Sequence, residues 1–98
     1  MSTHPDIDRF EEGIVKEALE YLWEFSQKNG WEIPIIVPYA SFMEGGAAVQ
    51  WGSKIILYVV IDYTWSPARL RIEVDYMGVV EGFYYPSQVS ELIMFLLK

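Results

Sequence analysis

The sequence predicts an α+β domain: an N-terminal helix, a four- to five-stranded antiparallel meander and a short C-terminal helix. Apolar residues recur at helical spacing near the two ends of the chain, strand-like alternation fills the middle, and the expected strand connections are short. Helices segregated from strands in this way are expected to pack on one face of the sheet. The length of 98 residues predicts a single domain that spans residues 1–98.

The first expected element is a helix from about Pro5 to Lys28. Its apolar positions recur at spacings of three and four: Ile7, Phe10, Ile14, Ala18, Leu22 and Phe25. Asn29 and Gly30 supply the left-handed stop that commonly ends a helix. Gly13 falls inside this helix, at a cost of about 1 kcal/mol relative to alanine.

Five strand segments are expected after the helix. They are Ile33–Val37, Ala47–Trp51, Lys54–Tyr63, Arg69–Tyr76 and Val79–Tyr85. Pro34 and Pro38 remove ladder donors, so the first segment belongs at a sheet edge or in an irregular approach to the sheet. Tight turns at Gly52-Ser53 and Met77-Gly78 join neighbouring strands as hairpins, which predicts a meander. The loop at Met77-Gly78 has either two or three residues, so the register of the last strand stays open.

Alternation along the strands assigns their residues to two faces. If the 64–67 loop closes between its neighbours, the two long strands pair with Tyr58 opposite Glu73. A two-residue turn at Gly52-Ser53 then places Trp51 on the same side as Tyr58. The face turned away from the helices is thus expected to carry Val49, Trp51, Ile56, Tyr58, Val60, Arg69, Arg71, Glu73 and Asp75.

These nine residues are the expected contacts for a protein partner or for a second copy of the chain. Monomers rarely leave such an apolar patch uncovered, and interface cores are enriched in aromatic residues and arginine. The alternative is cover by the final helix or by residues 31–43. That helix, expected over Gln88–Leu97 with Ser87 as its cap, is apolar on nearly all sides, which fits either a core helix or an oligomer contact.

Composition and charge exclude several chemistries. Fourteen acidic and seven basic residues give a net charge of −7, which disfavours direct nucleic-acid binding. There is no cysteine, and the only histidine, His4, is expected to be solvated at a frayed terminus, so no catalytic site, metal or cofactor is expected. No signal peptide is visible and no apolar run approaches the roughly 20 residues of a membrane helix, which indicates a cytoplasmic protein without membrane contact.

The expected function is therefore that of a small, acidic, non-enzymatic interaction module, with an inhibitor or immunity-type role as one form of it. Two alternatives stay open. One is a binding domain for a small apolar or aromatic ligand, lined by Trp23, Trp31, Tyr39 and Phe42. The other is a nucleic-acid-mimicking inhibitor, because residues 1–32 hold eight acidic and three basic residues.

Overall fold

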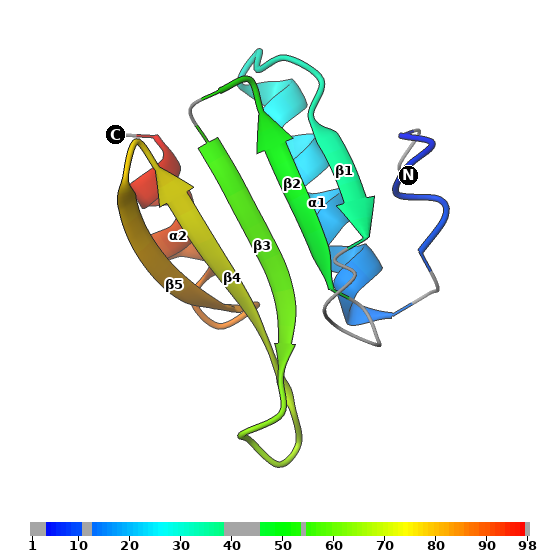
Figure 1. Ribbon diagram of the computed structural model, residues 1–98, viewed down its shortest axis with the longest axis vertical. Helices are drawn as coiled ribbons and strands as arrows, with labels where there is room; N and C mark the ends of the chain where they lie inside the picture. Colours follow the sequence, from blue (N-terminus) through cyan, green and yellow to red (C-terminus); the bar gives the residue numbers. More distant parts are fainter. Residues whose placement is uncertain (1–3, 11–12, 39–45, 54, 98) are drawn as a thin grey trace.

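The computed structural model describes residues 4–10, 13–38, 46–53 and 55–97, and it confirms the predicted fold class. The element order is α1 (Ile14–Lys28), β1 (Ile35–Pro38), β2 (Ala47–Trp51), β3 (Ile55–Asp62), β4 (Arg69–Tyr76), β5 (Val79–Tyr85) and α2 (Val89–Leu96). The five strands form one antiparallel meander sheet in the order β1-β2-β3-β4-β5. Both helices lie behind this sheet in Figure 1, so the face toward the viewer carries no helix.

The core lies between the sheet and the two helices. Alternate residues of β3 and β4 are almost completely buried there: Leu57, Val59, Leu70, Ile72 and Val74. α1 adds Leu19 and Leu22 to this layer, and α2 adds Leu92 and Leu96. The helical period and the strand period thus bring two apolar sets together, and their burial stabilises the fold.

The hairpin of β3 and β4 has the predicted register. Asp62 pairs with Arg69, and Tyr58 pairs with Glu73. β1 lies at one edge of the sheet, as its prolines predicted. At the other edge, the two-residue Met77-Gly78 turn adopts positive φ angles of 51° and 87°, which suits the twist of a tight hairpin.

The predicted first helix was too long at its N-terminal end. α1 begins at Ile14, Gly13 occupies its N-cap position, and residues 5–9 form turns. Ile7 in these turns is fully buried, so a turn segment that packs on the core produced the same apolar spacing as a helix. At the second helix, Gln88 rather than Ser87 occupies the N-cap position.

His4 is buried and not solvated, with only 5% of the residue exposed. Its Nδ1 accepts a hydrogen bond from the backbone N–H of Asp6 at 3.1 Å, and its Nε2 lies 3.1 Å from the carbonyl oxygen of Pro34. Since Nδ1 accepts, Nε2 carries the proton and donates to Pro34. The imidazole also packs edge-on against Trp23, at 5.0 Å between ring centroids. The N-terminal segment is therefore anchored to the chain that enters β1.

The hairpin of β2 and β3 differs from the prediction, and the difference moves two predicted contact residues. Trp51 pairs with Ile55 and Val49 pairs with Leu57, so three residues, and not two, separate the strands. One additional residue turns every side chain of β2 to the opposite face. Val49 and Trp51 consequently lie on the helix-covered face, where they are 1% and 4% exposed.

Candidate protein interface

The outer face of the sheet, opposite the two helices, is the candidate site. Seven of the nine predicted contact residues lie on it, all of them from β3 and β4. The pairing register adds residues from the other three strands. In full, the outer face consists of Ile35, Val37, Ala48, Gln50, Ile56, Tyr58, Val60, Asp62, Arg69, Arg71, Glu73, Asp75, Val80, Gly82 and Tyr84.

Apolar residues lie on the outer face at both edges of the sheet and on the central β3, with Gln50 of β2 and the charged row of β4 between them. Ile35 is 62% exposed on β1, and Val80 is 65% exposed on β5. Between these edges Ile56, Tyr58 and Val60 are half-buried, because neighbouring strands shield the side chains of the central β3. An exposed apolar surface of this extent is typical of an interaction site.

The charged part is the outer row of β4, which is ordered by sign. Arg69 and Arg71 come first along the strand, and Glu73 and Asp75 follow at the same two-residue spacing. The Nε of Arg71 lies 3.3 Å from an Oε atom of Glu73. The Arg71 guanidinium also lies across Gly82 of β5, where a Cβ atom would come within 2.7 Å of it. Glycine at position 82 thus leaves room for the arginine to lie flat on the sheet.

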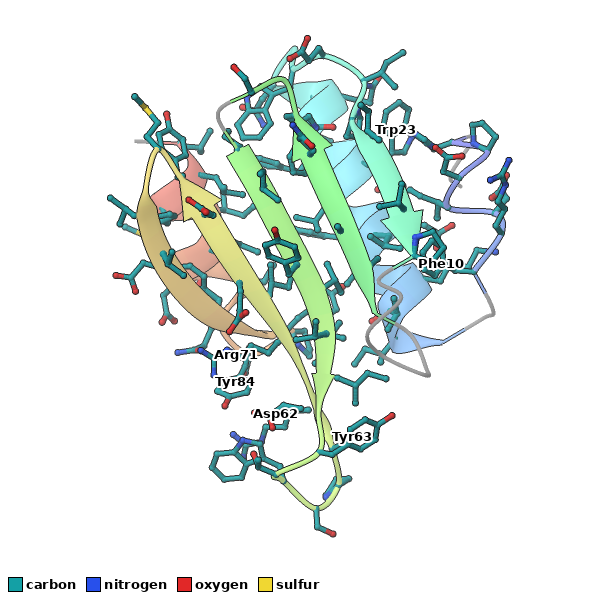
Figure 2. The ribbon with its side chains drawn as sticks, viewed as in Figure 1. Phe10, Trp23, Asp62, Tyr63, Arg71 and Tyr84 are labelled. Carbon is teal, nitrogen blue, oxygen red and sulfur yellow. The ribbon has the colours of Figure 1, made fainter. Side chains whose placement is uncertain are left out.

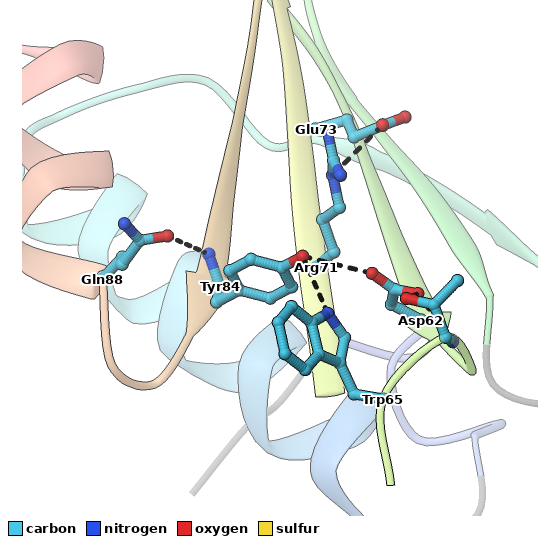
Figure 3. Close-up of polar contacts among 7 residues, drawn as sticks. Asp62, Trp65, Arg71, Glu73, Tyr84 and Gln88 are labelled. Atoms are coloured by element: carbon cyan, nitrogen blue, oxygen red, sulfur yellow. Dashed lines mark hydrogen bonds and ion pairs between the residues drawn. The ribbon is translucent and has the colours of Figure 1, made fainter. Parts of the chain in front are cut away.

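An aromatic cluster adjoins the outer face next to the β3–β4 connection (Figure 3). The Tyr84 hydroxyl accepts a hydrogen bond from Trp65 Nε1 at 3.1 Å and donates one to Asp62 at 3.2 Å. The Arg69 guanidinium stacks on the Trp65 ring at 3.9 Å from its centroid, a favourable cation–π geometry. Tyr84, Asp62 and Arg71 gather at the same end of the sheet in Figure 2.

Asp62 is held in its charged form by the connection that follows it. Thr64 donates both its hydroxyl, at 2.6 Å, and its backbone N–H, at 3.0 Å, to one Oδ atom of Asp62. These hydrogen bonds, led by the one from the Thr64 hydroxyl, lower the pKa of Asp62 below its usual value. The outer face therefore ends in a fixed negative charge beside the stacked Arg69.

The sequence did not predict Trp65 and Tyr84 as members of the site. Trp65 lies in a connection, where side-chain periodicity carries no information about facing. Tyr84 reaches the outer face because the Met77-Gly78 turn has two residues, which pairs it with Arg71. The outward position of Tyr84 could therefore be predicted from the sequence only if the Met77-Gly78 turn was taken to have two residues and not three.

A surface pocket of about 450 Å³ lies beside the turn that joins β2 to β3. It is lined by Trp31, Glu32, Trp51, Gly52, Ser53 and Ile55. Of the predicted ligand-lining residues, Trp31 borders this pocket, Trp23 packs on His4, and Tyr39 and Phe42 lie outside the described residues. The pocket contacts do not identify a ligand, so small-ligand binding stays a prediction, as does mimicry of nucleic acid by the acidic helix.

Neither a metal-ligating cluster nor a membrane-spanning helix occurs within residues 4–10, 13–38, 46–53 and 55–97. Over that part of the chain, no cluster of three or more histidine, aspartate or glutamate side chains is arranged to hold a metal ion. Within the same ranges, neither helix combines the length and the apolar character that crossing a bilayer requires.

The fold and the candidate site together define an α+β protein with an antiparallel sheet that is covered on one face and open on the other. No protein-family model, curated protein or solved structure matches the chain. The function is therefore argued from the geometry of the open face.

Proposed function

We propose that this protein is a non-enzymatic interaction module that docks a protein surface on the outer face of its sheet. The observation that carries the proposal is the set of apolar side chains on the helix-free face: Ile35 and Val37 on β1, Ile56, Tyr58 and Val60 on β3, and Val80 on β5. Neither helix shields these side chains from solvent, and the charged row of β4 lies between Val80 and the apolar residues of β3. An inhibitor or immunity-type role is one form that such docking takes.

The size of the face supports this proposal. Five strands of four to eight residues, at about 4.8 Å between strands and about 3.3 Å per residue, project to roughly 500 Å². Side chains that stand on this face make its accessible surface larger than the projection. A standard interface buries about 800 Å² on each partner, so one complete sheet face is of the right order.

The experiment is site-specific photocrosslinking in the native host. A photoreactive phenylalanine analogue replaces Tyr58 on the outer face, and in a matched control it replaces Tyr21, which is 37% exposed on α1. We expect a crosslinked protein product from position 58 and none from position 21. Equal products from both positions, or none from position 58, contradict the proposal.

A second pair of variants tests whether the apolar surface itself is used. In the position-58 background, Val60→Asp places a charge on the outer face and should abolish the product. Met94→Asp is the control, because Met94 is 70% exposed on α2, behind the sheet. A product that survives Val60→Asp means that the outer face is not the contact surface.

A further inference from the structure

We infer that the protein surface docked on the outer face is a second copy of the same chain, stacked face to face about a two-fold axis with the two β4 strands antiparallel. This inference rests on the proposed function, because it names the occupant of the same face. Four observations carry it: the order of charges on β4, the absence of ion pairs for two of them among the described residues, the position of the β3 side chains relative to the proposed axis, and the small net charge of the outer face.

The charges along β4 are self-complementary. A two-fold axis that passes through the level of Ile72 brings Arg69 opposite Asp75 of the second copy and Arg71 opposite Glu73 of the second copy. Each pair forms twice, and all four residues stand on the outer face. A row with positive charges at one end and negative charges at the other is satisfied by its own inverted copy, which is the requirement for an interface between identical patches.

The outermost charges of this row have no ionic partner among the residues that the structure describes. The Arg69 guanidinium stacks on Trp65, and neither it nor the Asp75 carboxylate forms an ion pair in residues 4–10, 13–38, 46–53 and 55–97. Stacked sheets lie about 10 Å apart, a distance that an arginine and an aspartate span together. The second copy therefore gives Asp75 an ionic partner and gives Arg69 one in addition to Asp62, its cross-strand neighbour on β3.

The same axis brings the apolar residues of β3 together. Val59 pairs with Ile72, so the axis also passes the level of Val59 on β3, with Tyr58 and Val60 on either side of it. Tyr58 of each copy then lies against Val60 of the other. Stacked sheets keep their strands within about 30° of each other, which leaves these residues at the centre of the contact.

The net charge of −7 does not oppose this arrangement, because most of it lies away from the contact. The outer face itself holds Arg69 and Arg71 against Asp62, Glu73 and Asp75, a net charge of only −1 among its described residues. α1 lies behind the sheet with three acidic and two basic residues. In the stacked dimer both copies of α1 lie on the outside, separated by two sheets and the interface. That separation exceeds the screening length of about 8 Å at physiological ionic strength.

The test uses reversed charges on the full chain, with mass measured by size-exclusion chromatography and light scattering from micromolar to submillimolar concentrations. The wild type is expected to be a dimer at the upper end of this range. Arg69→Glu sets like charges against Asp75 of the second copy, and Asp75→Lys sets them against Arg69. Each single variant is expected to dimerise at least tenfold more weakly than the wild type.

Mixing the two variants is the decisive step. In a pair made of one Arg69→Glu chain and one Asp75→Lys chain, both outer contacts have opposite charges again, so the equimolar mixture is expected to regain the dimer. Arg9→Glu and Asp8→Lys are matched controls, because they make the same charge changes in the exposed N-terminal turns and should leave the dimer intact. Circular dichroism of each variant checks the fold.

The outcomes separate this inference from the proposed function. A wild type that stays monomeric throughout the range overturns the dimer. If position 58 then crosslinks to a different protein, the proposed function stands and only the inference fails. If Val60→Asp abolishes the dimer but the mixture of the two charge variants does not restore it, the two-fold register is wrong. The outer face would still form the dimer contact in that case. A dimer that resists Val60→Asp overturns the inference, and the position-58 crosslink then decides the proposed function.

Discussion

The two faces of the sheet are made by the same strands, yet they are buried very differently. On the inner face Leu57 and Val74 are completely buried beneath the helices, whereas on the outer face Ile35 and Val80 are more than 60% exposed. Both faces carry large apolar side chains. Folding of the single chain buries the central apolar residues of the inner face, and the proposed association would bury apolar residues of the outer face.

This contrast between faces could be predicted for part of the sheet only. The strict alternation of β4 and the length of its connection to β3 were sufficient to place Tyr58 and Glu73 correctly. The placement of Trp51 failed because a strand's facing changes with every residue added to a turn, and turn length is poorly specified by composition. The error was confined to β2, since the pairing of β3 with β4 does not depend on that turn.

The largest expected effect is on the free energy of unfolding, which should fall much further when Trp51 is truncated than when Tyr58 is. Trp51 is 4% exposed, with its ring 5.4 Å from that of Trp31, so Trp51→Ala should lower the free energy of unfolding by about 3–5 kcal/mol. Tyr58 is half-buried on the open face, and Tyr58→Ala should cost the monomer about 1 kcal/mol. Urea denaturation at a concentration where the protein is monomeric measures both values.

Trp51→Phe refines this comparison. The Trp51 indole N–H is buried and has no hydrogen-bond partner among the residues that the structure describes, so phenylalanine retains most of the ring contact and removes an unsatisfied donor. We expect it to destabilise the protein much less than alanine does. If Tyr58→Ala proves more damaging than Trp51→Ala, the assignment of inner and outer faces in β2 is wrong.

A smaller effect is expected where the N-terminal segment closes the inner layer. His4→Ala removes the hydrogen bond to the Pro34 carbonyl and the edge contact with Trp23, which should cost about 1–3 kcal/mol. Limited proteolysis should then cleave the segment before α1 sooner than in the wild type. Asp8→Ala is the control, because Asp8 is exposed in the same turns. Equal protease sensitivity of the two variants means that His4 does not anchor the segment.

The burial of His4 was beyond sequence-based prediction for a physical reason. A single histidine near a chain end has no periodic partners, and its two hydrogen bonds are made to the backbone of Asp6 and Pro34, whose side chains give no indication of the contact. Ile7 contributed an apolar signal, but that signal fitted a helix equally well. Long-range contacts to backbone atoms leave no pattern along the sequence.

The smallest expected effect is a pH dependence at the end of the outer face. The pKa of Asp62 is lower in the folded protein than its usual value of 3.8, chiefly because the Thr64 hydroxyl donates to the carboxylate. A lowered folded pKa stabilises the protein above the unfolded pKa, and this contribution disappears as the pH falls through the folded pKa. The difference in urea midpoint between wild type and Asp62→Asn should therefore be constant near neutral pH and shrink below about pH 4.

Two further variants test which hydrogen bond contributes most to the lowered pKa of Asp62. Thr64→Ala removes the leading hydrogen bond to Asp62, whereas Tyr84→Phe removes a weaker one, so NMR titration of the Asp62 carboxyl should show the larger rise in pKa for Thr64→Ala. The reverse order contradicts the geometry of the cluster. Because Tyr84 also receives the Trp65 indole N–H, Tyr84→Phe should in addition loosen Trp65 from the sheet. Loss of that contact would weaken the platform on which Arg69 stacks, and with it the pair that Arg69 is inferred to form with Asp75 of a second copy.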